Sequence, residues 1–271
     1  MKKKYIILII VILAIVAALI YVLAGGKDNY LNKPESVAYD SVGERFLISN
    51  VGDGSIVAMD NQGQYSEFIK EGFEAPKGLL LVGDLLYVTD PAQIHVVSVS
   101  EAKIIESYPI NDAVGLNDIA MDEYGKLYIT DTPGNSVFVY DPQSKTQQRI
   151  SHELISAPNG IIYDRPRWQM FIVGNKEQSP ILSLDTRDMS VSIFKDTMYS
   201  NLDGIAIDDL GRIYFSSWKE QMIIEIPQEQ NRFITDLKGY DSAADIYYHL
   251  PSNELIVPML KQNKIERITL N

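Results

Sequence analysis

The sequence predicts an all-β protein, a six-bladed β-propeller preceded by one transmembrane helix. The first observation is a repeat, in which a short apolar strand follows a turn six times along the chain. The steps between the repeats are 42, 40, 42, 44 and 41 residues. A strand-based repeat of this length is typical of a propeller blade. Because the blades share one axis, residues about 40 positions apart in sequence are expected to share one site. The residues that open the six repeats are Glu35, Lys77, Asn117, Asn159, Asp203 and Ala244.

The second observation is an apolar segment near the N-terminus. Residues 5–24 form an uncharged, almost wholly apolar run of 20 residues, long enough as a helix to cross a bilayer core of about 30 Å. Three lysines, Lys2 to Lys4, precede it and predict that this end stays in the cytoplasm. A cleaved signal peptide is the alternative, although the apolar region of such peptides usually has about 7–15 residues.

Three regions follow from these two features. We expect a signal anchor over residues 1–25, a polar tether over 26–33 and the propeller over 34–271. The protein would then be anchored to the membrane, with the propeller facing the periplasm or the cell exterior.

Each repeat is read as four strands separated by turns. In the third repeat the strands are expected at 119–121, 126–130, 136–140 and 146–150. The turns between them are rich in Asp, Gly, Pro and Asn, which favour reversals of the chain. The sixth repeat offers only three strands, at 245–248, 254–258 and 264–270. Either residues 26–33 supply its fourth strand or the last blade has three.

Composition excludes several classes of function. The formal net charge of -12 argues against nucleic-acid binding, which needs a basic surface. The absence of cysteine excludes thiol catalysis, thiolate metal sites and disulfides. The three histidines occupy different repeat positions, so they do not predict a zinc site. With no coiled coil or second domain in the sequence, we expect a monomer.

The residues that open the repeats predict a metal site. Glu35, Asn117, Asn159 and Asp203 provide two carboxylates and two amides at one repeat position. Such an all-oxygen set suits a hard divalent cation, Ca²⁺ best. Asp118 and Asp245 occupy the next repeat position and could add outer oxygens.

Two alternatives to a metal site stay open at this point. Asx residues before a strand often cap turns by bonding to their own backbone. Lys77, at the same repeat position of the second blade, could neutralise Glu35 or Asp203 without any metal.

Four of these segments carry a resemblance to a known family. The chain resembles the calcium-dependent six-bladed propellers of the senescence marker protein/gluconolactonase family, related to strictosidine-synthase-like proteins and paraoxonases. The resemblance covers about residues 33–270. It rests on Pro34-Glu35-Ser36-Val37, Leu116-Asn117-Asp118-Ile119, Pro158-Asn159-Gly160-Ile161 and Leu202-Asp203-Gly204-Ile205.

The resemblance implies a lactone or ester hydrolase. It implies Glu35, Asn159, Asp203 and Asn117 as calcium ligands and Asp203 as the catalytic base. Asn117 and Lys77 would contact the small-molecule lactone or ester. The family's substrate-holding arginine is replaced by Gly115, which makes a sugar lactone doubtful as the substrate.

A non-catalytic function is the alternative hypothesis. The segment 127–136, Leu-Tyr-Ile-Thr-Asp-Thr-Pro-Gly-Asn-Ser, resembles the core of an NHL repeat. Propellers of that kind bind a protein or glycan partner. The discriminating feature is the set of Glu, Asn, Asn and Asp at one repeat position, which a pure scaffold does not require.

Overall fold

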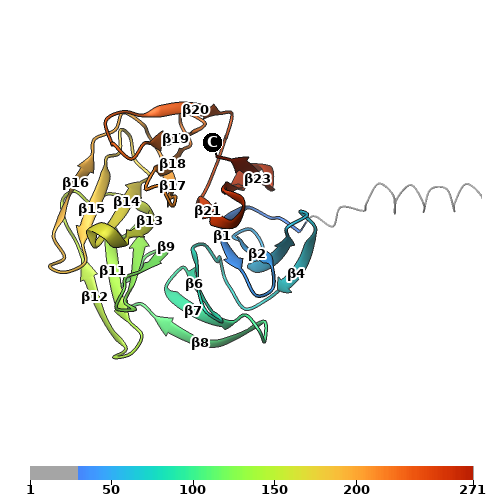
Figure 1. Cartoon of the computed structure of the whole chain (residues 1–271). Coiled ribbons are helices and arrows are strands. Elements are labelled where there is room, and N and C mark those ends of the chain that lie inside the picture. Colours follow the sequence, from blue (N-terminus) through green and yellow to red (C-terminus); the bar gives the residue numbers. More distant parts are fainter. Residues whose placement is uncertain (1–29, 271) are drawn as a thin grey trace, which may run out of the picture. The chain divides into compact units, whose positions relative to one another are not determined.

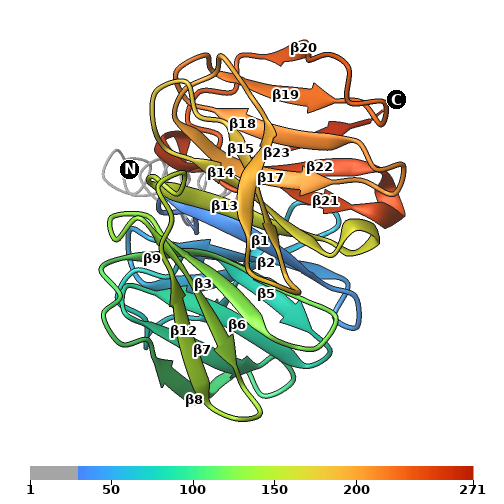
Figure 2. The ribbon, with the colours of Figure 1, turned by 90° about the vertical axis from the view of Figure 1, so that its left-hand side faces the viewer.

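The computed structural model describes residues 30–270 and confirms the six-bladed β-propeller. Six antiparallel sheets follow one another around an axis in chain order (Figure 1). Figure 2 shows the side of the ring that carries the outer strands of the third and fourth blades, β12 (Thr146–Ile150) and β16 (Val191–Lys195). The predicted transmembrane segment, residues 5–24, lies outside the described residues. Within residues 30–270, no helix has the length and apolar character needed to cross a membrane.

The first three blades have four strands each. The first blade contains β1 (Pro34–Asp40), β2 (Arg45–Asn50), β3 (Ser55–Asp60) and β4 (Tyr65–Ile69). The second contains β5 (Leu79–Val82), β6 (Leu85–Asp90), β7 (Gln93–Ser98) and β8 (Lys103–Pro109). The third contains β9 (Leu116–Met121), β10 (Leu127–Asp131), β11 (Ser136–Asp141) and β12 (Thr146–Ile150).

The last three blades include short 3-10 helices in their turns. The fourth blade contains β13 (Pro158–Asp164), η1 (Arg165–Arg167), β14 (Gln169–Gly174), β15 (Ile181–Asp185) and β16 (Val191–Lys195). The fifth contains β17 (Leu202–Ile207), β18 (Ile213–Ser217), β19 (Met222–Ile226) and β20 (Ile234–Lys238). The sixth contains β21 (Tyr247–His249), η2 (Leu250–Ser252), β22 (Glu254–Met259), η3 (Leu260–Gln262) and β23 (Lys264–Thr269).

The innermost strands β1, β5, β9, β13, β17 and β21 line the axis. Each contacts the innermost strand of the next blade, and β21 contacts β1 to close the ring. All six run in the same direction along the axis, so their first residues lie at one end of the channel. The residues that open the repeats are therefore brought to that end, as the repeat predicts.

The apolar core lies between the blades. Five clusters of buried side chains fill the spaces between successive blades, from the first to the sixth. In the space between the second and third blades, for example, Ile94 packs in one cluster with Ile129. Each blade buries one face against the blade before it and the other face against the blade after it. Strands covered in this way are apolar on both faces.

The sixth blade has three strands, which is one of the two arrangements left open by the sequence. Residues 30–33 form no strand beside β23. They instead follow the first blade, where the amide of Val51 donates to the carbonyl of Lys33 over 3.1 Å.

Contacts between the first and sixth blades close the ring without a shared sheet. The amide of Asp245 donates to the carbonyl of Glu35 over 3.1 Å, and the Ser36 hydroxyl donates to Asp245 Oδ2 over 2.7 Å. Farther along the axis, the rings of His249 and Tyr39 lie with their centroids 4.2 Å apart. These blades appear side by side in blue and red in Figure 1.

Candidate metal centre at one end of the axial channel

The predicted ligands lie at β-bulges. In the first, third, fourth and fifth blades, the pairing of the innermost strand with its neighbour shifts register just after the strand begins. The shifts enclose Glu35, Asn117, Asn159 and Asp203. A bulge leaves one residue unpaired and changes the direction of its side chain. The bulge therefore explains why these side chains do not follow the regular alternation of side chains along the strand.

Hydroxyl groups from the second strands fix the bulges. The Thr130 hydroxyl accepts the amide of Asp118 over 2.9 Å and donates to the carbonyl of Asn159 over 2.6 Å. The hydroxyl thus joins the backbone beside one candidate ligand to the carbonyl of the candidate ligand in the next blade. Three other hydroxyls make the same two bonds at the equivalent position, those of Ser49, Thr89 and Ser216.

Glycine follows the opening residue in three blades because the next blade approaches closely. A Cβ atom on Gly160 would lie 2.4 Å from the carbonyl oxygen of Asp203. One on Gly204 would lie 2.5 Å from the Cα of Asp245, and one on Gly78 would lie 2.7 Å from the Cα of Asp118. Any larger residue would push the neighbouring innermost strand away.

Polar side chains replace glycine in the other three blades and bind the neighbouring strand. Asp118 Oδ2 accepts the amide of Ile161 over 2.7 Å. The Ser36 hydroxyl accepts the amide of Leu79 over 3.2 Å and donates to Asp245. Asp118 and Asp245 therefore join adjacent blades, a structural role that the repeat alone did not reveal.

Three oxygens of the candidate ligands are buried and accept no hydrogen bond within residues 30–270. They are Glu35 Oε2, Asn117 Oδ1 and Asn159 Oδ1. The three residues are only 5%, 6% and 3% exposed. A buried acceptor without a partner destabilises a fold by about 1–3 kcal/mol. Three such oxygens from three different blades are the kind of ligand that a hard cation requires.

Four buried carboxyl groups at this end of the channel resist ionisation. The pKa of Asp203 is raised to about 7, first by burial and then by Asp245, against the opposing effects of Lys77 and the Asn159 amide. Burial, Asp203 and Asp245 raise the pKa of Glu35 well above its usual range, against the effect of Lys77.

The two inner carboxyl groups behave in the same way. The pKa of Asp118 is raised by burial and by Asp245, and burial raises the pKa of Asp245 to about 6. A divalent cation near these groups would favour their charged forms.

The donor chemistry fits a hard divalent cation held by carboxylate and amide oxygens together. Acidic and imidazole groups do not suffice, since residues 30–270 contain no cluster of three or more His, Asp or Glu side chains able to hold a metal. The asparagine oxygens must therefore complete the set. Glu35, Asn159, Asp203 and Asn117 would hold the ion, as the resemblance implies.

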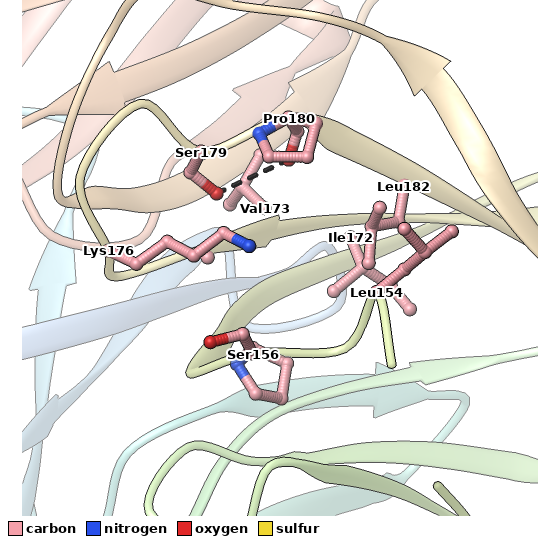
Figure 3. A pocket seen from close by; sticks show the side chains of 10 residues that line it. Leu154, Ser156, Ile172, Val173, Lys176, Ser179, Pro180 and Leu182 are labelled. Atoms are coloured by element: carbon pink, nitrogen blue, oxygen red, sulfur yellow. Dashed lines mark hydrogen bonds between the residues drawn. The ribbon is translucent and has the colours of Figure 1, made fainter. Parts of the chain in front are cut away.

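A cavity of about 370 Å³ continues along the axis beyond the candidate ligands. Its walls are mostly apolar residues of the innermost strands, and they include Asp118 and Asp245. A second, much smaller cavity lies beside the fourth blade, where Leu154, Lys176 and Ser179 surround about 10 Å³ (Figure 3). That volume holds about one water molecule, so it offers no room for a substrate.

The structure brings some of the predicted site residues closer together than others. Glu35, Asp203 and Lys77 are close enough to shift the pKa values of the two acids, and the nearby Asn159 amide lowers the pKa of Asp203. Asn117 lies at the equivalent bulge, with its carbonyl bonded to the Thr89 hydroxyl of the preceding blade. The positioning hydroxyls were missed by the sequence reasoning. In four repeats the penultimate residue of the second strand is Ser or Thr, and this pattern could have identified them.

Fold and site together define a class of protein, the six-bladed propellers with carboxylate and amide oxygens at one end of the axial channel. The sequence model of the SMP-30/gluconolactonase/LRE-like region matches residues 33–238. The chain therefore belongs to this family, which confirms the resemblance.

Solved structures share the fold at low sequence identity. A gluconolactonase from Xanthomonas campestris is 13% identical, with a TM-score of 0.73, and the match covers 90% of this chain and 88% of that chain. A streptogramin B lyase is 14% identical, with a TM-score of 0.68 and coverage of 89% and 94%. A chain of a nidogen/laminin complex is 15% identical, with a TM-score of 0.68 and coverage of 83% and 93%. No curated protein matches the sequence.

Proposed function

We propose that the propeller is a calcium-dependent hydrolase of lactones or esters, with its site at the Glu35 end of the channel. The observation that carries the proposal is the set of three buried, unpaired acceptor oxygens beside Asp203. Membership of a family that includes gluconolactonases supports the reaction class.

The chain's own residues supply the base and the orientation. Asp203 is the candidate base for the attacking water, and a bound cation would keep its carboxylate charged and able to accept a proton near neutral pH. The water oxygen then bonds to the substrate carbonyl carbon, the acyl C–O bond breaks, and the leaving alkoxide takes up the proton that Asp203 accepted. The Asn159 amide lies beside Asp203 and would help to orient its carboxylate. When bound, the cation would polarise the substrate carbonyl as a Lewis acid.

The test is a calcium titration of the full-length protein in detergent by calorimetry, followed by a lactone and aryl-ester screen with and without chelator. Glu35→Gln and Asp203→Asn should abolish calcium binding and turnover. Asp112→Asn, at an exposed position, is the matched control and should change neither. Absence of calcium binding in the parent protein would refute the proposal. Calcium binding without hydrolysis of any substrate would instead favour the non-catalytic alternative, a protein- or glycan-binding propeller.

We also propose that residues 5–24 anchor the propeller to the membrane with its site outside the cytoplasm. The apolar run and the three lysines before it support this orientation. Cell fractionation should find the chain in the membrane fraction, and protease added outside the inner membrane should digest the propeller. Recovery of the chain from the cytosol would contradict the anchor.

A further inference from the structure

Lys77 is the one cationic residue among the six that open the repeats. Its backbone is held on both sides, because its amide donates to the carbonyl of Thr89 over 2.9 Å and its carbonyl accepts the Ser49 hydroxyl over 2.6 Å. The following residue is Gly78, which packs against the next blade. The start of the Lys77 side chain is therefore fixed at the same end of the channel as Glu35.

The Lys77 side chain begins at the end of the channel where the repeats open and lies near Glu35 and Asp203. Its charge lowers the pKa of both acids, whereas Asp118 and Asp245 line the cavity farther along the axis. The residue is half-buried. A group arriving from solvent would meet Lys77 before it met the inner carboxyl groups.

The Lys77 side chain makes no hydrogen bond or ion pair with any residue in the range 30–270. It is thus a partly buried cation that has no direct partner among these residues. With a divalent cation bound, the charges of Glu35 and Asp203 would be balanced by the ion. Lys77 would then give the outer layer of the site one net positive charge.

We propose that Lys77 forms an anion subsite beside the metal, which selects substrates that carry a carboxylate or phosphate group in addition to the scissile ester. The proposal rests on the function proposed above and narrows its substrate class. The substrate carbonyl would face Asp203 while its remote anionic oxygen accepts a hydrogen bond from the Lys77 ammonium. Such charge-assisted bonds are short and about twice as strong as neutral ones.

The test compares two product-like anions on the calcium-loaded, full-length protein. Succinate has two carboxylates, one for the metal and one for Lys77, whereas butyrate has only the first. By calorimetry, we expect succinate to bind about tenfold more tightly than butyrate, the factor that corresponds to one charge-assisted hydrogen bond. The heats of mixing each anion with calcium in buffer are subtracted.

Three variants show whether the preference depends on Lys77. In Lys77→Met the preference for succinate should disappear, and calcium should bind more tightly because a like charge is gone. Lys77→Arg should keep most of the preference. Lys219→Met removes an exposed lysine from a turn at the same end of the propeller and should change neither titration.

The outcomes separate the two proposals. Calcium binding with a succinate preference that persists in Lys77→Met would overturn the anion subsite alone. Failure of the parent protein to bind calcium would overturn the proposed function and the subsite with it. Thermal melting of each variant identifies any that fail to fold, in which case Lys77→Arg and Lys77→Gln provide the comparison.

Discussion

The hydroxyl of Thr130, in the third blade, donates a hydrogen bond over 2.6 Å to the backbone carbonyl of Asn159, in the fourth. The candidate ligand is thus positioned by the blade before it, at the point where its own strand is bulged. The same arrangement fixes Lys77 from Ser49 and Asn117 from Thr89. The first three blades therefore each help to place the residue that opens the next repeat.

Thr130→Val should weaken calcium binding without unfolding the protein. Valine keeps the shape of threonine but leaves the amide of Asp118 and the carbonyl of Asn159 without their shared partner. We expect a loss of about 1–3 kcal/mol in the free energy of unfolding and a several-fold weaker calcium affinity. Thr146→Val, on an exposed outer strand, is the control and should leave both unchanged. Denaturant unfolding and calorimetry measure the two quantities, and an unchanged calcium affinity would contradict the positioning role.

The stability of the metal-free protein should fall as pH rises from about 4 to about 7, through the contribution of Asp203. Its pKa is 3.8 as a free side chain and about 7 in the fold, so the folded state holds the proton more tightly. The favourable contribution is therefore present at low pH and is lost as the pH rises through this range.

Asp203→Asn isolates this contribution from the other acids. In chelator, the melting temperature of the parent should fall relative to that of Asp203→Asn as the pH rises from 4 to 7. Saturating calcium should remove most of that trend for the parent, because the ion stabilises the charged carboxylates. A difference that does not vary with pH would show that Asp203 is not the raised group.

The repeat in the sequence determined more of the fold than of the site. In the third blade, the outer strand expected at 146–150 is β12 (Thr146–Ile150) as observed, because alternating residues and turn formers define its ends. The innermost strand, expected at 119–121, begins earlier, at Leu116. The bulge that includes Asn117 lies in this extension, and it depends on hydrogen bonds to another strand. Local sequence does not contain that information.

The roles of Asp118 and Asp245 show the same limit. They follow the opening residues at repeat spacing, so the sequence suggested outer ligands of a metal. In the structure their oxygens accept bonds from Ile161 and Ser36, which belong to the neighbouring blades. Whether an acidic side chain at this repeat position faces an ion or a neighbouring strand is decided by tertiary contacts.

Gly160→Ala should damage the site and the fold together. The added Cβ would lie 2.4 Å from the carbonyl oxygen of Asp203, so β13 and β17 must separate. We expect a loss of about 1–3 kcal/mol in the free energy of unfolding and a clear loss of calcium affinity.

Gly83→Ala provides a control of similar size for that substitution. Gly83 has a φ of 61° and nothing within 4 Å of its Cβ position, in a turn at the other end of the second blade. It should lower stability by about 1 kcal/mol through backbone strain and leave calcium binding intact. Equal effects of the two substitutions on calcium affinity would show that the close approach at Gly160 does not position Asp203.

Val173→Thr tests whether a hydroxyl in the fourth blade can make the same two hydrogen bonds as the four hydroxyls in the other blades. Val173 is next to the last residue of β14, the position that Thr130 occupies in β10, and it is fully buried. A hydroxyl there would lie between the amide of Gly160 and the carbonyl of Asp203, as the other four hydroxyls lie between an amide of their own blade and a carbonyl of the next. Burying a hydroxyl without a partner usually destabilises a protein by about 1–3 kcal/mol. The control Val137→Thr introduces a hydroxyl at a buried position in an apolar cluster and should show that loss. Val173→Thr should instead change the free energy of unfolding by less than about 1 kcal/mol, since both of its hydrogen bonds can form. If the two variants lose stability equally in denaturant unfolding, the fourth blade does not offer the partners that its neighbours do, and Asp203 is held by packing against Gly160 alone.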